Sequence, residues 1–359
     1  MPSGVRSPDD VRTSLTQTVA DRPARKGGSQ DASRLTSRPY EGTPMAMMVR
    51  PPEVRAREMR TARPRPGLRR GRRLALLGLA YATPTVGMVA VFFVAPLVLV
   101  GWMSLNHWPL LGVPELNAPE NFAKVTDNDL FADAVWFTLT YTIIITVLLF
   151  ALALGMAIMV QHQRRGVAFF RTAFFLPVAV GFASASLLFL GLLSDEIGPV
   201  NDVLASVGLI DGYVSWTSGS ASSALGSAVA LVLWRFAGFN MLILLTGLQA
   251  IPTELYEAAK LDGASRWQAF RRVTLPIMRP TIALVLTLMI TGSLLAFDQF
   301  WILTRGGPDN STTSLVMVIY REAFIRLDLG SAAAISVLLL AVLVVFNVIQ
   351  LGVLRRRSR

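Results

Sequence analysis

The chain of 359 residues contains no cysteine and only two histidines, His107 and His162. The absence of cysteine excludes disulfide bonds, thiolate metal ligands and a cysteine nucleophile. Two histidines far apart in the sequence do not predict a metal cluster. No G-x-x-x-x-G-K-[S/T] phosphate loop occurs, so the chain has no motif that binds ATP in that manner. We therefore expect no catalysis and no cofactor.

Charged residues are also few, at 16% of the chain, whereas soluble domains average about 25%. Hydrophobic residues make up 53%, and the mean hydropathy is +0.51. A helix needs about 20 apolar residues to cross the hydrocarbon layer of a membrane. Segments of this kind lie at about 74–103, 132–160, 167–193, 222–250, 281–303 and 331–354. They are too long and too uniformly apolar for barrel strands, so we predict an all-α membrane protein with six transmembrane helices, the third bent at Pro177.

The net charge of +11 raises the possibility of nucleic-acid binding. The bases, however, gather in alternate connections between the apolar segments. The N-terminal flank, two of the loops and the C-terminus hold nineteen Lys and Arg, against four in the other three connections. Because Lys and Arg stay on the cytoplasmic side of a membrane, we predict that both termini are cytoplasmic, together with the loop 251–280. We expect contact with membrane lipid and none with nucleic acid.

The first 70 residues differ from the rest of the chain. They are rich in Arg, Pro, Ser and Thr and show little apolar periodicity. Such a composition cannot bury enough apolar surface to fold. We predict a disordered basic tail over residues 1–70, with no cleaved signal peptide, followed by a six-helix transmembrane domain over residues 71–359.

The loop 251–280, between the fourth and fifth crossings, has an unusual helix pattern. Thr253 suits the N-cap of a first short helix, and Gly263 suits the left-handed residue that ends it. Ser265 and Gln268 have the spacing of a capping box. We predict two short helices joined at a glycine bend.

The second of these helices is expected to end at Pro276 and Pro280, before the fifth crossing. Its apolar residues Trp267, Phe270 and Val273 fall about one turn apart. This stripe would face a partner protein or rest on lipid headgroups. The residues by themselves leave both interpretations open.

The same stretch resembles the EAA loop of binding-protein-dependent ABC importer permeases. That pattern is E-A-A, three residues, Gly, about nine residues, an aliphatic residue and Leu-Pro. It is carried here by Glu257, Ala258, Ala259, Gly263, Val273, Leu275 and Pro276, with Val where Ile is commoner. In that family the loop is a cytoplasmic coupling helix docked in a cleft of the ATPase. The resemblance assigns ATPase coupling to Glu257, Ala258, Ala259, Asp262 and Gly263.

A second stretch, 297–324, is similar to the sugar permeases of the maltose and glycerol-3-phosphate type. The pattern is LT-x-G-G-P, a Ser/Thr-Thr pair and Y-x-x-A-F. It is carried by Leu303, Thr304, Gly306, Gly307, Pro308, Thr312, Thr313, Tyr320, Ala323 and Phe324. The likeness covers about residues 74–354.

This resemblance implies a type I ABC importer permease fold in the cytoplasmic membrane of a prokaryote. It also implies a heterodimer with a second permease subunit, a cytoplasmic ABC ATPase that hydrolyses the ATP, and an extracytoplasmic solute-binding protein. The implied substrate is a carbohydrate. Two alternatives stay open: import of glycerol-3-phosphate or another polyol phosphate, and a non-transporting scaffold docked to an ATPase.

Polar side chains within the fourth and fifth apolar segments are candidates for the substrate path, because such groups are costly in lipid and usually face a bundle interior. They lie beside aromatic residues, as sugar recognition requires. The candidates are Arg235, Phe239, Asn240, Ser293, Asp298 and Gln299. Other roles remain possible: Asp298 pairs with Arg235 or caps a backbone break, and Asn240 bonds another helix. A phosphorylated substrate would need bases, and Arg235 is the one candidate.

Overall fold

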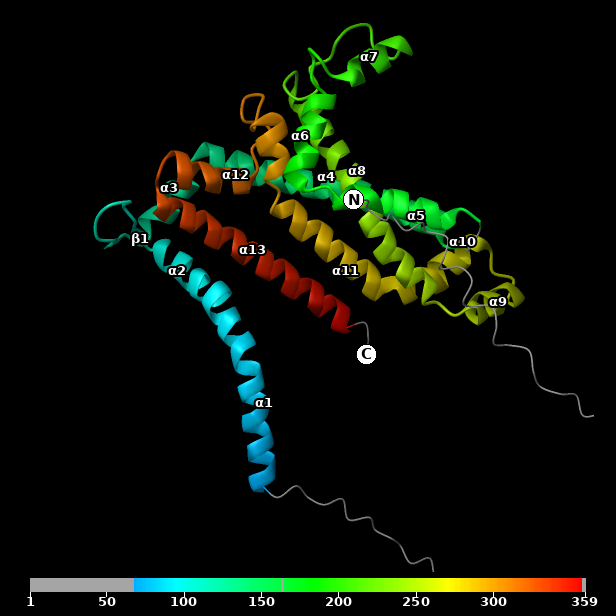
Figure 1. Cartoon of the computed structure of the whole chain (residues 1–359), viewed down its shortest axis with the longest axis horizontal. Helices are drawn as coiled ribbons and strands as arrows, with labels where there is room; N and C mark the ends of the chain where they lie inside the picture. The colour runs from blue at the N-terminus through cyan, green and yellow to red at the C-terminus, as the bar shows by residue number, and fades with distance from the viewer. Residues whose placement is uncertain (1–67, 163–164, 357–359) are drawn as a thin grey trace, which may run out of the picture. The chain divides into compact units, whose positions relative to one another are not determined.

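The computed structural model of the chain describes residues 68–162 and 165–356 (Figure 1). The predicted tail, up to residue 67, lies outside the described residues, and so do residues 357–359 at the C-terminus. The disorder of the tail and the side of the membrane on which the termini lie therefore stay predictions.

The described part of the chain has five helices long and apolar enough to cross a membrane, and six if a bent helix pair is counted as one span. The six predicted segments are therefore confirmed as helical, but the fifth lies earlier than the predicted 281–303, at Arg266–Leu294. In order they are α1 (Leu68–Val89) continuing through the π-helix η2 (Ala90–Val94) into α2 (Ala95–Met103); α4 (Asp129–Val160); the bent pair of α5 (Val167–Phe175) with the 3₁₀-helix η3 (Leu176–Ala179) and α6 (Phe182–Leu192); α8 (Ala221–Gln249); α10 (Arg266–Ala269) continuing through the π-helix η4 (Phe270–Thr274) into α11 (Leu275–Leu294); and α13 (Leu329–Arg356).

Short elements join the crossings. They are strands β1 (Asn106–His107) and β2 (Glu115–Leu116), helices α3 (Glu120–Thr126), α7 (Pro199–Ser206), α9 (Thr253–Leu261) and α12 (Leu315–Tyr320), and π-helices η5 (Phe300–Thr304) and η6 (Arg321–Ile325). The two strands form a small antiparallel hairpin in which Asn106 pairs with Leu116. All other regular structure in the described ranges is helical, as predicted.

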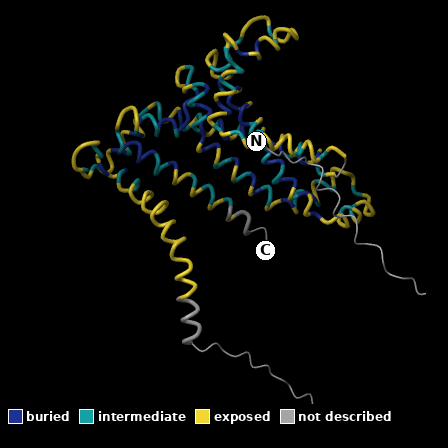
Figure 2. The backbone as a smooth tube through the Cα atoms, viewed as in Figure 1, coloured by how far each residue is buried: buried dark blue, intermediate teal, exposed yellow. Residues whose placement is uncertain are grey.

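The core lies where α4 packs against α8 and α11. On α4 the buried side chains recur at every fourth residue: Tyr141, Ile145, Leu149, Ala153 and Ala157. Residues four apart share one helix face, and small side chains on that face let the helix backbones approach closely. Figure 2 shows the buried residues gathered in this part of the molecule. α11 and α13 also run side by side (Figure 1).

Gly238 allows the backbones of α5 and α8 to lie unusually close together. A Cβ atom at this position would overlap the carbonyl oxygen of Phe174 on α5. Only glycine therefore allows the two backbones to meet here, and this contact holds the first half of the bent third crossing against the core.

The first crossing is packed differently from the rest. None of the most apolar window of Leu77–Met103 is buried, against 56% of the corresponding window in Ala221–Gln249. The exposed stretch of α1 stands out in Figure 2. The apolar side chains of this crossing are therefore not buried against the other described helices, and they remain free to contact other molecules.

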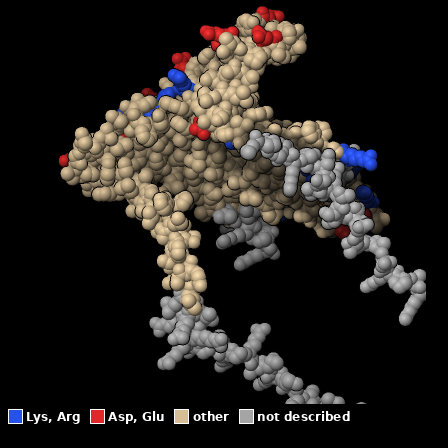
Figure 3. Space-filling view, in the orientation of Figure 1, with Lys and Arg blue, Asp and Glu red and all other residues tan. Residues whose placement is uncertain are grey.

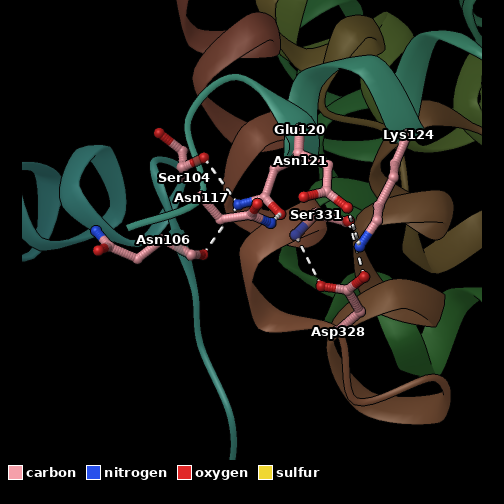
Figure 4. A network of polar contacts seen from close by, with 8 residues as sticks. All are labelled: Ser104, Asn106, Asn117, Glu120, Asn121, Lys124, Asp328 and Ser331. Carbon is pink, nitrogen blue, oxygen red and sulfur yellow. Dashed lines mark hydrogen bonds and ion pairs between the residues drawn. The ribbon is translucent and has the colours of Figure 1, made fainter. Parts of the chain in front are cut away.

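At the hairpin end of the bundle, buried amides hold the connections together (Figure 4). The side-chain nitrogen of Asn121 donates to the backbone oxygens of Ser104, at 3.0 Å, and Asn106, at 2.9 Å. Asp328 caps α13 by accepting from the backbone N–H of Ser331 at 3.0 Å and from its hydroxyl at 2.9 Å. These bonds attach α3 to the turn after α2 and fix the start of the sixth crossing.

Two details predicted for the fourth-to-fifth connection are wrong. Pro252, not Thr253, is the N-cap of α9. The second short helix does not end at Pro276 or Pro280, because α10 runs through η4 directly into α11. Pro276 directly follows the π-helical turn of η4, and Pro280 lies inside α11, so both are accommodated within a continuing helix.

Candidate functional site

A cavity of about 390 Å³ lies within the bundle. Its wall is formed by α4, α6, α8 and α11 and by the residues that follow α11. The volume falls in the usual range for small-molecule sites, about 300–1,000 Å³. The third crossing is a broken helix, and the chain leaves the helix again just after the fifth crossing. Irregular backbone at membrane depth is tolerated where it is buried in protein or lines a cavity.

The first break lies in the third crossing, where the two helices meet at 96° after the Pro177 turn. The predicted bend at Pro177 is thus confirmed. Arg235 of α8 donates to the carbonyl of Val180 through Nη2, at 2.8 Å, and Nε, at 3.1 Å. Its guanidinium also lies over the rings of Phe182 and Phe236, 4.9 and 4.6 Å from their centroids. Arg235 therefore satisfies backbone oxygen freed by the break.

The second break follows the C-terminus of α11. Leu295 and Ala296 leave the helix, and a new turn begins with Asp298 and Gln299. The hydroxyl of Ser314 donates to the Ala296 carbonyl at 2.6 Å. This break aims the polar side chains that follow it into the bundle.

The structure brings five of the six predicted substrate-path residues to the cavity wall. Phe239, Asn240, Ser293, Asp298 and Gln299 all line it. Arg235 does not line the cavity, because its donors are taken up at the break in the third crossing. Whether the five contact a substrate stays a prediction.

The alternative roles considered for the polar residues are not seen in the described ranges. The ion pairs there are Lys124 with Glu120 and Arg326 with Glu322, so Asp298 and Arg235 are not paired. Asp298 makes no hydrogen bond with described residues, so it does not cap the backbone break. Asn240 donates to the carbonyl of Phe236 on its own helix, at 2.9 Å, and not to another helix.

Two buried oxygens at the cavity wall stand out. Asn240 Oδ1 and Gln299 Oε1 have no hydrogen-bond partner in the part of the chain that the structure describes. Both residues are almost fully buried, at 4% and 2% exposure. An unsatisfied buried acceptor costs about 1–3 kcal/mol, and neither oxygen is exposed to the cavity in this conformation.

Tyr141 and Phe182 line the cavity and were missed by sequence reasoning. Gln299 donates to the Tyr141 hydroxyl at 3.2 Å across 158 positions of sequence. The polar tip of a tyrosine within an apolar segment was the one signal for Tyr141. Of the aromatic residues beside the predicted polar candidates, Phe236 and Phe297 line the cavity, whereas Trp301 stacks on Phe297, with ring centroids 5.7 Å apart, without lining it.

The α9–α10 connection has the predicted shape. Gly263 has φ of +73°, and Ser265 with Gln268 forms the predicted capping box. Apolar side chains protrude from both helices: Leu261 is 89% exposed and Trp267 66%. Exposed apolar side chains that cluster in this way are typical of a surface that binds another protein or a membrane.

A hydrogen bond between the hydroxyls of Tyr256 and Thr274, at 2.8 Å, joins α9 to η4. Thr274 is buried at the start of the fifth crossing. Movement of α9 would therefore be passed to α11 through this bond as well as through the chain. Sequence reasoning missed both residues, because no periodic pattern links them.

A second, polar cavity of about 310 Å³ lies near η6 and the start of α13, lined by Lys124, Glu322, Arg326 and Asp328 among others. Glu322 is only 5% exposed and accepts from Arg326 at 2.7 Å. Burial raises the pKa of Glu322 above its ordinary value, and the charge of Arg326 partly opposes this shift.

Charges are distributed unevenly over the surface. Acidic side chains gather around α7, and basic ones mark the opposite end near α5 and α10 (Figure 3). The segment 194–221 holds four acids and no Lys or Arg.

Comparisons with known proteins agree on one family. Residues 151–359 match the model of the binding-protein-dependent transport system inner membrane component. The chain is 32% identical to the sulfoquinovosyl glycerol transport system permease protein SmoG of Agrobacterium fabrum, over 80% of this chain and 92% of that protein. It is 31% identical to the sn-glycerol-3-phosphate transport system permease protein UgpA of Escherichia coli, over 77% of this chain and 93% of that protein.

The fold is also that of a solved transporter. A chain of a bacterial ABC transporter that imports the acidic polysaccharide alginate superposes with a TM-score of 0.70 and 24% identity, covering 81% of this chain and 99% of that one. The chain has the type I ABC importer permease fold, and it belongs to the family of binding-protein-dependent transport system inner membrane components.

Proposed function

We propose that this inner-membrane permease subunit moves a saccharide through the cavity lined by α4, α6, α8 and α11, in an importer driven by a separate ATPase. The cavity itself is the observation that carries the proposal. It combines aromatic side chains, such as Phe239 and Phe297, with the polar side chains of Asn240 and Gln299. Sugars present hydroxyl donors and apolar ring faces, which this wall complements.

Coupling to the ATPase is assigned to the α9–α10 connection, on the cytoplasmic side. Glu257 forms no ion pair with described residues and is exposed on α9, so its carboxylate is free to bind a base on the ATPase. Leu261 and Trp267 offer apolar contacts for the same partner. The basic end of the molecule in Figure 3 supports this orientation, because bases favour the cytoplasmic face.

Closure of the ATPase around ATP would pull α9 and turn the bundle from inward- to outward-facing. Moving such an equilibrium from 1:99 to 99:1 takes about 5.5 kcal/mol of differential binding. The lever must therefore be stiff. The direct continuation of α10 into α11 and the Tyr256–Thr274 bond both support a stiff lever.

The remaining partners follow from the same assembly. A second permease subunit would complete the translocation path and cover part of the apolar surface of the first crossing, and lipid would cover the rest. A solute-binding protein would deliver the saccharide to the face that carries α7 and the hairpin.

The test measures uptake of a panel of radiolabelled saccharides in a strain that lacks the natural gene and carries variants of the chain. Gly263→Ala is compared with Gly208→Ala, because both glycines have positive φ, +73° and +70°, with no atoms near an added Cβ. Backbone strain is thus matched, and only the position differs. We expect Gly263→Ala and Glu257→Lys to reduce uptake severely with normal membrane levels, while Gly208→Ala transports. Normal uptake by both coupling-loop variants would contradict the assignment.

A further inference from the structure

We propose that the cavity accepts uncharged saccharides and excludes anionic ones, and that Asp298 sets this selectivity. The inference rests on the proposed saccharide function and adds the charge of the substrate. It starts from two observations at the cavity wall: its single carboxylate forms no ion pair with a described residue, although Arg235 lies near enough for the two charges to interact, and its other hydrogen-bonding side chains are neutral.

Asp298 is the one Asp, Glu, Lys, Arg or His among the described residues that line the cavity. No base within the described chain forms an ion pair with it. A carboxylate at the wall of the cavity repels a second anion brought close to it. Two like charges about 5 Å apart, at an effective dielectric constant of about 20, repel each other. The free energy of this repulsion is larger than the free energy of a tenfold change in affinity.

The base that an anionic substrate would need is occupied elsewhere. Arg235 donates to the carbonyls of Val180 and Val178. It does not line the cavity, although the two rings that flank its guanidinium, Phe182 and Phe236, do. Recruiting Arg235 for a phosphate or carboxylate would leave the broken third crossing with unsatisfied carbonyls.

The other hydrogen-bonding side chains at the wall are neutral. Asn240 donates one amide hydrogen to Phe236, Gln299 donates one to Tyr141, and Ser293 donates its hydroxyl to Ile290. Each amide has a second N–H, and the Tyr141 hydroxyl accepts from Gln299 without donating to a described residue. A sugar hydroxyl both donates and accepts, so these neutral groups suit an uncharged ligand.

Family membership does not settle this question. UgpA is a permease for glycerol-3-phosphate, and the transporter that shares this fold imports an acidic polysaccharide. Charge selectivity must therefore come from the side chains of the individual cavity, and in this chain they favour a neutral ligand.

The experiment measures equilibrium binding of radiolabelled sugars to the purified complex of both permeases and the ATPase. The binding protein is left out, so that the measured affinity is that of the permease complex itself. The probes are matched pairs: glucose with glucuronate, cellobiose with cellobionate, and trigalactose with trigalacturonate. For any pair that binds to the wild-type complex, we expect the affinity for the neutral sugar to be at least about tenfold higher than the affinity for the anionic sugar.

Asp298→Asn should raise the affinity for the anionic member about tenfold and change that for the neutral member by less than about threefold. Asp298→Glu should keep the discrimination. Asp202→Asn is the matched control, because Asp202 lies on α7, bonds to Tyr213 and does not line the cavity. It should change neither affinity.

A wild-type complex that binds an anionic member as tightly as its neutral counterpart overturns the proposed selectivity. Discrimination that persists in Asp298→Asn overturns the role of Asp298. In both cases the saccharide function still stands. If neither neutral nor anionic sugars bind or are taken up, the proposed function itself fails. Should Asp298→Asn not assemble, the Asp298→Glu complex and the wild-type pairs still decide the selectivity.

Discussion

The close approach of α5 to α8 at Gly238 makes a sharp prediction about stability. Gly238→Ala places a methyl group against the Phe174 carbonyl and the backbone of Phe175. These atoms belong to a helix backbone and cannot rotate away, so the helices must separate. Overpacking of this kind costs about 1–3 kcal/mol, and the better helix propensity of alanine returns about 1 kcal/mol at most. We expect a net loss of about 1–2 kcal/mol.

Gly226→Ala is the matched control. Gly226 lies on the same helix, α8, and an added Cβ there meets nothing within 4 Å. This variant gains only the propensity term and should be as stable as the wild type or slightly more so. The assay is chemical or thermal unfolding of the purified subunit in detergent, followed by gel filtration. Equal stability of the two variants would refute the claimed backbone contact.

Three further predictions concern other contacts. Arg235→Met should destabilise the subunit by about 1–3 kcal/mol, because it leaves the Val180 carbonyl at the break without a donor; Arg235→Lys should recover part of the loss, and unfolding curves without such recovery would contradict the assignment. The raised pKa of Glu322 favours its protonated form in the folded protein, so its contribution to stability is present below its ordinary pKa and declines as pH rises through the raised value. Thermal unfolding of the wild type against pH should show this decline, and Glu322→Gln should remove it; an unchanged profile in the variant would refute it. Tyr256→Phe breaks the bond to Thr274 and should lower uptake per ATP hydrolysed in vesicles, Thr274→Val should do the same, and the double variant should be no worse; additive losses would show that the two hydroxyls do not act as a pair.

Hydropathy was sufficient to predict the six crossings, because burial in lipid demands long apolar segments whatever the tertiary contacts. The Ser265–Gln268 capping box and the left-handed Gly263 were also predicted, since both depend on local geometry. The prolines were misleading. Pro276 and Pro280 indicated helix ends, but the helix continues through the π-helical turn of η4 and past both prolines.

The candidate site was predictable only where a polar residue stood out within its own apolar segment, as Asn240, Asp298 and Gln299 do. The role of Arg235 depends on carbonyls 55 and 57 positions earlier in the chain, and that of Tyr141 on a glutamine 158 positions later. Contacts across such distances are set by helix packing, which no local pattern records.

The central claim is that the α9–α10 connection transmits the movement of a separate ATPase into the bundle, and cross-linking tests it most directly. The natural chain has no cysteine, so Leu261→Cys and Val207→Cys each introduce a single thiol at an exposed apolar position, 89% and 61% exposed. We predict that Cys at position 261 cross-links to the ATPase in membranes, with a yield that changes when ATP is added, and that it resists an impermeant thiol reagent applied from outside. Val207→Cys should react with that reagent and capture no ATPase. Labelling of the position 261 thiol from outside, or its failure to capture the ATPase, would contradict the account.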